Sequence, residues 1–259
     1  AASADGNRIM VTNGTYVLDG QVTVDKAVTI RSVTGAASTI IDGGLPWRSN
    51  RCFYINKVDA VIDGFTIQNG WVSGKLSWPD MCGGGVMCYS NGFVMNCIVR
   101  DCAADVGGGV WCREGGVVSN CVFSGNAALL SWARGGGISM RSGGLAIDSA
   151  FVGNIASGSG GGVSHEMGGT LQRCVVSNNY ADLYGGGVDI FHGGVMRESR
   201  IENNECNGYG GGVIVRGVPE SGEMYNCLVM GNVATNPVFG AGGGVSAQGI
   251  GWMYNCTIA

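Results

Sequence analysis

Short stretches of alternating apolar and polar residues recur along the chain. Residues 107–128, GGGVWCREGGVVSNCVFSGNAA, show the unit: a Gly triplet, an alternating segment, a Gly pair, a second alternating segment and an Asn-Ala close. Alternation with a period of two is typical of strands. No window keeps helical spacing over the roughly 10 residues that a helix needs. The pattern therefore predicts short β-strands joined at sharp corners.

The same unit is repeated through most of the chain. Gly triplets begin at Gly83, Gly107, Gly135, Gly160, Gly185, Gly210 and Gly242, with spacings of 24, 28, 25, 25, 25 and 32 residues. The longer spacings come from insertions at Leu129–Arg134 and Thr235–Ala241. A unit this small cannot bury its own apolar face, so its copies have to stack. The repeat predicts a parallel β-solenoid with about 25 residues per coil.

Aligned copies define columns that run along the solenoid axis. The positions after each triplet predict inward pairs such as Val110 with Cys112 and Val163 with His165. Between them lies a mixed column that we expect to face solvent: Met87, Trp111, Ser139, Ser164, Asp189, Ile214 and Ser246. A ladder of stacked amides is expected from Asn126, Asn154, Asn179, Asn204 and Asn232, because Asn tolerates the left-handed corner and its amide can bond to that of the next coil. Cys97, Cys121, Cys174, Cys227 and Cys256, with Ser149 and Ser199, form a column of small inward side chains.

The first part of the chain is less regular. Residues 1–82 lack the triplets but keep the alternation, and residues 83–259 carry the regular units. We interpret residues 1–259 as a single all-β domain of about ten coils.

Composition narrows the function classes. Collagen is excluded because the 49 Gly have no three-residue period and Pro occurs only 4 times. A net charge of −4 argues against nucleic-acid binding, and no apolar run reaches the roughly 20 residues that span a bilayer. The calcium-binding GGxGxDx repeat is missing, so we expect neither a metal nor another cofactor.

The repeats resemble those of right-handed parallel β-helix proteins of the pectate-lyase-like superfold. They are more similar to the passenger repeats of chlamydial polymorphic outer-membrane proteins and related bacterial surface proteins, which carry GGA[ILV] and FxxN motifs. Here GGGI at 135–138 approximates the first motif, and FSGN at 123–126 and FVGN at 151–154 match the second. The resemblance implies a right-handed solenoid that is secreted or displayed on a cell surface and is often adhesive.

Two function hypotheses follow. The first is an extracellular structural or adhesive solenoid without enzymatic activity, whose partners are surface glycans, proteins or itself. The alternative is a carbohydrate-binding or carbohydrate-active β-helix, a polysaccharide lyase or hydrolase. Its site would need carboxylates and arginines gathered on one outer face. The outward positions supply Arg113, Glu114, Arg141, Glu166, Asp189, Arg216 and Glu220, of which Asp189 is expected to stack near Glu166 and Arg216.

Aromatic and cysteine side chains give the remaining candidates. Trp111, Tyr225, Trp252 and Tyr254 are predicted to be exposed and available to stack on sugar rings, with Tyr225 and Tyr254 in one column. Cys52 and Cys82 lie outside the columns and are the candidates for a disulfide.

The chain stops at Asn255–Ala259, before the Asn-Ala close of its coil. Either a longer protein continues the coil, or another copy completes it and builds a head-to-tail filament.

Overall fold

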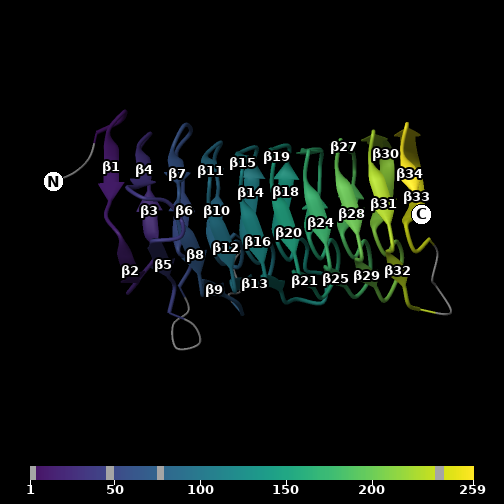
Figure 1. Ribbon diagram of the computed structural model, residues 1–259, viewed down its shortest axis with the longest axis horizontal. Helices are drawn as coiled ribbons and strands as arrows, with labels where there is room; N and C mark the ends of the chain where they lie inside the picture. The colour runs from purple at the N-terminus through teal and green to yellow at the C-terminus, as the bar shows by residue number, and fades with distance from the viewer. Residues whose placement is uncertain (1–3, 45–49, 75–78, 237–241) are drawn as a thin grey trace.

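The computed structural model shows a rod of stacked coils, with the N-terminus at one end and the C-terminus at the other (Figure 1). It describes residues 4–44, 50–74, 79–236 and 242–259. Within these ranges the regular structure consists of β-strands alone, arranged in three parallel sheets. The predicted all-β parallel solenoid is confirmed.

Sheet A forms the broad side of the rod, because each coil contributes two consecutive strands to it. The strands that follow the Gly triplets, and their N-terminal counterparts, are β3 (Val22–Val24), β6 (Phe53–Ile55), β10 (Val86–Cys88), β14 (Val110–Glu114), β18 (Ile138–Ser142), β22 (Val163–His165) and β26 (Val188–Phe191). The second set is β1 (Arg8–Val11), β4 (Thr29–Ser32), β7 (Val61–Asp63), β11 (Phe93–Met95), β15 (Val117–Ser119), β19 (Leu145–Ile147), β23 (Thr170–Gln172) and β27 (Gly194–Arg197). In the last coils the two strands merge into β30 (Val213–Tyr225) and β33 (Val245–Tyr254).

Two narrower sheets close the coil. Sheet B contains β2 (Gly14–Val17), β5 (Thr39–Asp42), β8 (Thr66–Gln68), β12 (Ile98–Arg100), β16 (Val122–Ser124), β20 (Ala150–Val152), β24 (Val175–Ser177), β28 (Arg200–Glu202), β31 (Leu228–Met230) and β34 (Thr257–Ile258). Sheet C contains β9 (Trp71–Val72), β13 (Ala103–Ala104), β17 (Ala127–Ala128), β21 (Ile155–Ala156), β25 (Tyr180–Ala181), β29 (Glu205–Cys206) and β32 (Val233–Ala234).

The register places equivalent repeat positions on top of one another. Val110 pairs with Ile138, and Ile138 pairs with Val163. The turns are longer than predicted, with about 28 residues each rather than about 25. The longest step, of 33 residues, lies in the N-terminal part from Phe53 to Val86, whereas the step from Ile138 to Val163 is 25 residues.

The corners use residues in the left-handed conformation. Between sheets B and C this residue directly precedes each ladder Asn, for example Gly153 (φ 65°) before Asn154 and Asn178 (φ 56°) before Asn179. The ladder Asn residues themselves do not have positive φ. Their role is therefore to hydrogen-bond through the side-chain amide and not to form the corner. The second Gly of a triplet has a different role: a Cβ on Gly161 would overlap two carbonyl oxygens, including that of Gly186 in the next coil.

The core is a single apolar column along the rod. Phe123 and Phe151 stack in it, with ring centroids 4.7 Å apart and planes at 13°. The inward positions after the triplets, from Val86 to Val215, are buried as expected. Apolar side chains therefore pack on one another from coil to coil along the rod.

The column expected to face solvent is buried as well. Met87, Trp111, Ser139, Ser164, Asp189, Ile214 and Ser246 all have little or no exposed surface. The Gly-triplet corner folds the residues before it against the outer face of the strand that follows. Cys82 and Val106, for example, pack with Met87 and Trp111. Alternation correctly identified the outer side of the strand, but the corner covers that side.

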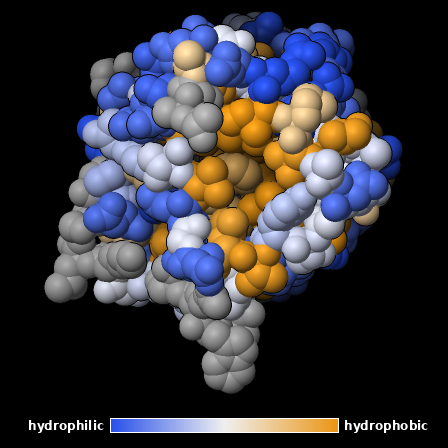
Figure 2. All heavy atoms as spheres, turned by 90° about the vertical axis from the view of Figure 1, so that its left-hand side faces the viewer, coloured by the Kyte–Doolittle hydropathy of each residue, from blue (hydrophilic) through white to orange (hydrophobic). Residues whose placement is uncertain are grey.

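The rod end that carries β1 and β2 presents apolar side chains at its centre, inside a polar rim (Figure 2). Ile9, Met10, Tyr16 and Val17 on these strands are exposed. A search of the described residues for a helix long and apolar enough to cross a membrane finds none.

Candidate functional site

Three of the four predicted aromatic residues come together on the outer face of sheet A, in a group we call the aromatic platform: Tyr225, Trp252 and Tyr254. The register pairs Tyr225 with Tyr254. Their rings are parallel to within 8°, with centroids 5.0 Å apart. Trp252 and Tyr254 are 52% and 48% exposed. The platform therefore presents aromatic side chains of two strands, β30 and β33, to solvent.

Charged groups border the platform. The Tyr225 hydroxyl donates to Oε2 of Glu223 at 3.0 Å, a bond that raises the pKa of Tyr225. Glu223 pairs in register with Trp252, and Arg197 pairs with Tyr225. A depression of about 420 Å³ adjoins the platform and is lined by Val195, Arg197, Glu198, Glu223, Tyr225 and Asn226. Hydrogen-bonding groups thus lie beside an aromatic face.

Trp111 does not belong to this surface. It was expected to be exposed, but the structure buries it completely in a small cluster with Cys82 and Met87. It lies on β14, in the column that the Gly-triplet corner covers. Trp111 is therefore a packing residue, and the prediction that it is available to a ligand is wrong.

A second group of candidates forms the charged corner: Arg134, Glu166, Asp189 and Arg216. As expected, Asp189 lies beside Arg216. The Arg216 Nε and Nη2 donate to the two carboxylate oxygens of Asp189 at 2.9 and 2.7 Å. Asp189 is fully buried and Arg216 is 15% exposed in its side chain. This is a buried ion pair with two parallel hydrogen bonds.

Glu166 belongs to the same corner through different partners. It accepts a 3.0 Å hydrogen bond from Oγ of Ser139 and lies 3.6 Å from Nη1 of Arg134. The ring of Phe191 joins the two ion pairs, because the guanidinium carbons of Arg134 and Arg216 lie 4.5 and 4.6 Å from its centroid. The corner therefore brings two carboxylates and two arginines into one continuous network.

The other outward charges predicted from the sequence are Arg113, Glu114, Arg141 and Glu220. Arg113 lies 3.8 Å from Glu114 and packs its guanidinium 4.3 Å from the centroid of the Tyr89 ring. Arg141 follows Met140 on β18, and its side chain is half-buried. The side chain of Glu220 lies outside the described residues.

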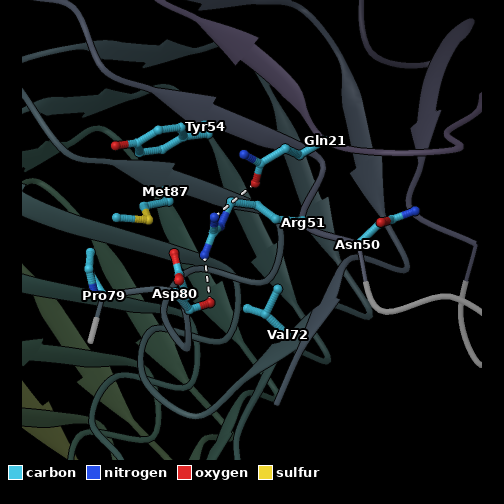
Figure 3. Close-up of a pocket in the computed structure, with 8 residues that line it drawn as sticks. All are labelled: Gln21, Asn50, Arg51, Tyr54, Val72, Pro79, Asp80 and Met87. Atoms are coloured by element: carbon cyan, nitrogen blue, oxygen red, sulfur yellow. Dashed lines mark hydrogen bonds between the residues drawn. The ribbon is translucent and has the colours of Figure 1, made fainter. Parts of the chain in front are cut away.

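Sequence reasoning missed a pocket of about 370 Å³ near the N-terminal coils (Figure 3). Its residues are Gln21, Asn50, Arg51, Tyr54, Val72, Pro79, Asp80 and Met87. The Arg51 guanidinium donates to Oε1 of Gln21 at 2.9 Å and to the backbone oxygens of Asp80 and Cys82 at 2.9 and 2.7 Å. Burial lowers its pKa. Residues 1–82 lack the repeat that would have placed Arg51 in a column.

The Asn ladder is a chain of buried amides. Nδ2 of Asn154 donates to Oδ1 of Asn179 at 3.0 Å and to the Phe123 carbonyl at 3.1 Å. The same two bonds recur at Asn126, Asn179 and Asn204. Asn232 ends the series with a bond to the Ile201 carbonyl.

The Cys/Ser column also forms hydrogen bonds. Cys121 Sγ lies 3.2 Å from the Ser119 carbonyl, and Ser149 Oγ lies 2.8 Å from the Ile147 carbonyl. All eleven cysteines are free thiols. Cys52 and Cys82 are therefore not bridged: Cys52 belongs to the main core, whereas Cys82 packs in the separate cluster with Trp111.

His165 lies in the core column between Met140 and Ile190. It is fully buried, and neither ring nitrogen has a hydrogen-bond partner. Burial lowers its pKa to about 4, so the ring is neutral at ordinary pH. Among the described residues, no three His, Cys, Asp or Glu side chains are placed to hold a metal ion.

The fold and these surfaces define a parallel β-solenoid with an aromatic platform and a charged corner. No family model matches the chain, and no curated protein matches its sequence. A solved PL6 alginate lyase in complex with a trisaccharide is similar, with 16% identity and a TM-score of 0.46. The match covers 88% of this chain but 54% of that one, so this chain spans about half the length of the solved protein.

Proposed function

We propose that this chain is a structural β-solenoid that binds carbohydrate through its aromatic platform, without cleaving it. The observation that carries the proposal is the parallel pair Tyr225 and Tyr254, extended by Trp252 and bordered by Glu223. Exposed aromatic faces bury the apolar faces of sugar rings, while carboxylates accept hydrogen bonds from sugar hydroxyls. Adhesion to a glycan-bearing surface is the role that such a platform supports.

Binding without turnover is supported by the state of the carboxylates in the charged corner. Asp189 is buried, and both of its oxygens accept hydrogen bonds from Arg216. Glu166 is held by Ser139 and Arg134, with 14% of its side chain exposed. General acid or base catalysis by a side chain requires that group to lie within hydrogen-bond reach of the substrate. These groups are engaged with the protein instead.

The direct test is binding to a panel of neutral and acidic polysaccharides by affinity electrophoresis and calorimetry. The double variant Trp252→Ala, Tyr254→Ala should lose about tenfold or more in affinity, as expected when buried aromatic contacts are removed. Product formation is followed in parallel, through new reducing ends and through the ultraviolet absorbance of an unsaturated sugar. We expect neither signal to rise.

Trp132→Ala is the matched control, because Trp132 is an exposed tryptophan that lies outside the platform and the rod ends. It should bind like the parent chain. Unchanged binding by the double variant would refute the platform as the binding site. Steady release of product would show that the chain is an enzyme. Circular dichroism on each variant confirms that the coils remain folded.

A second proposed role is head-to-tail assembly into filaments, and the two ends of the rod support it. The N-terminal end exposes apolar side chains inside a polar rim (Figure 2), and Met253 and Ile258 are exposed on β33 and β34. The two ends display edges of the same sheets, A and B, in the same parallel orientation. Copies of this chain that stack head to tail would continue both ladders. Light scattering tests this: mass should grow with concentration, and a monomer at all concentrations would refute it.

An extracellular location is part of the same proposal, and it is supported by the FxxN-type motifs. Fractionation of the producing cells tests it, since the chain should be found at the surface or in the medium.

A further inference from the structure

A second aromatic pair, Tyr184 and Tyr209, lines a pocket where sheet C leads into the Gly triplets. The pocket has a volume of about 380 Å³ and is lined by Asp182, Leu183, Tyr184, Asn207, Gly208, Tyr209 and Asn236. The two rings are parallel to within 13°, with centroids 5.9 Å apart. A bridge between the backbones of Tyr184 and Tyr209 fixes their register. None of these residues belongs to the aromatic platform.

The Tyr184 ring is held in place by the charged corner. The guanidinium carbon of Arg216 lies 4.2 Å from the Tyr184 ring centroid. Arg216 is itself fixed by its two bonds to Asp189 and by a 3.0 Å bond to Oγ of Ser159. A ring whose orientation is already set loses little freedom when a ligand arrives. The buried Asp189–Arg216 pair therefore also fixes the orientation of the Tyr184 ring in the pocket.

The polar rim of the pocket is formed by Asp182 and Asn207, which lie on adjacent coils. Oδ1 of Asp182 accepts a 2.9 Å hydrogen bond from the Tyr180 hydroxyl, which orients the carboxylate. Asn207 occupies the equivalent position of the next coil, and its N–H donates to the Ala181 carbonyl at 3.0 Å. Gly208 lets the two coils approach closely, because a Cβ there would overlap the Leu183 carbonyl oxygen. Two flat rings thus lie beside a carboxylate and an amide.

We propose that this pocket is a second saccharide site and that it takes a neutral sugar. A phenol ring of this pair can stack on the apolar face of a pyranose, while Asp182 and Asn207 are placed to bond its hydroxyls. The Asp182 carboxylate opposes the carboxylate of an acidic sugar, because like charges at short range repel. The inference shares a ligand class with the proposed function but rests on different residues.

Calorimetry with a glucose tetrasaccharide and a uronic acid tetrasaccharide tests the inference. We expect two sites for the neutral ligand on the parent chain and one on Tyr209→Ala. Tyr209→Phe keeps the ring and should stay within roughly threefold of the parent. Asp182→Asn keeps an acceptor for Tyr180 but removes the charge, so binding of the acidic tetrasaccharide should rise while neutral binding holds.

Tyr254→Ala separates this inference from the platform. If Tyr209→Ala changes nothing while Tyr254→Ala abolishes binding, the pocket is refuted and the platform stands. If only Tyr209→Ala abolishes binding, the pocket stands and the platform is refuted. Tighter binding of the acidic than of the neutral ligand by the parent chain would overturn the stated ligand class.

Discussion

The Nδ2 group of Asn179 donates a 2.9 Å hydrogen bond to Oδ1 of Asn204, one coil further along the rod. Oδ1 of Asn179 in turn accepts from Nδ2 and from the backbone N–H of Asn154, at 3.0 and 2.9 Å. Each amide thus ties three consecutive coils together in a place that water does not reach. The ladder is the polar counterpart of the phenylalanine stack beside it.

Replacement of one ladder residue should be costly. Asn179→Ala removes the acceptor of the Asn154 backbone N–H and a donor to the Phe151 carbonyl. At roughly 1–3 kcal/mol for each buried unsatisfied group, we expect a loss of about 3 kcal/mol in unfolding free energy. Denaturant titration measures it. Asn56→Ala, an exposed asparagine, should change stability by less than about 0.5 kcal/mol, and equal effects of the two changes would contradict the ladder's role.

The Cys/Ser column should tolerate serine better than an apolar residue. In Cys121→Ser the hydroxyl keeps the acceptor for the Cys97 N–H and the donor to the Ser119 carbonyl. Cys121→Val fills the space but removes both bonds, so it should be less stable than Cys121→Ser by about 1 kcal/mol or more. Thermal unfolding of the two variants decides, and a more stable valine variant would mean that apolar packing alone sets the column.

Thiol reactivity should report folding. Burial raises the pKa of Cys174 to about 11 and that of Cys102 to about 12, so these two thiols carry little thiolate in the folded chain at pH 8. A thiol reagent should therefore label the folded chain slowly and the denatured chain quickly. Rapid labelling of most of the eleven thiols under native conditions would contradict the burial that the structure shows.

His165 should make the fold sensitive to acid. Its pKa is about 4 in the folded chain and roughly 6.5 when unfolded, so between these values the unfolded chain binds more protons. Stability contributed by the neutral ring is complete above about pH 6.5 and is lost as the pH falls towards about 4. The loss is on the order of 3 kcal/mol.

His165→Met removes this titration and matches Met140 in the same column. Unfolding titrations from pH 7 to pH 4 should show a shallower slope for His165→Met than for the parent chain. Met140→Leu, a change between neutral residues in the same column, serves as the control and should keep the parent slope. Identical slopes for His165→Met and the parent would assign the acid sensitivity to other groups.

The Asp189–Arg216 pair should be far more sensitive to the loss of one partner than of both. Arg216→Met leaves a buried carboxylate unpaired, and we expect a cost of about 3–5 kcal/mol. The double variant Asp189→Leu, Arg216→Met removes both charges and should recover most of that loss. A double-mutant cycle by thermal unfolding measures the coupling, and simple additivity of the two changes would contradict a direct pair.

Repetition of the sequence made the fold and its columns predictable. Because each coil stacks on an almost identical one, the alternation of Val110 and Cys112 predicts the core position of every equivalent residue, and the Gly triplets mark every corner. The amide ladder, the small Cys/Ser column and the shared column of Tyr225 and Tyr254 follow from the same spacing. These features depend on contacts between equivalent residues of adjacent coils, and the repeat length identifies which residues are equivalent.

Contacts across the coil required the tertiary structure. Period-two alternation distinguishes the two sides of a strand, but it does not show that the corner before a Gly triplet folds over the outer side. Trp111 and Asp189 are therefore buried although their positions in the pattern are outward. The Arg51 pocket and the Tyr184–Tyr209 pocket likewise depend on how insertions and corners pack between coils. The sequence alone determined the stacking along the rod, whereas only the folded corner decided which outward residues still reach the solvent.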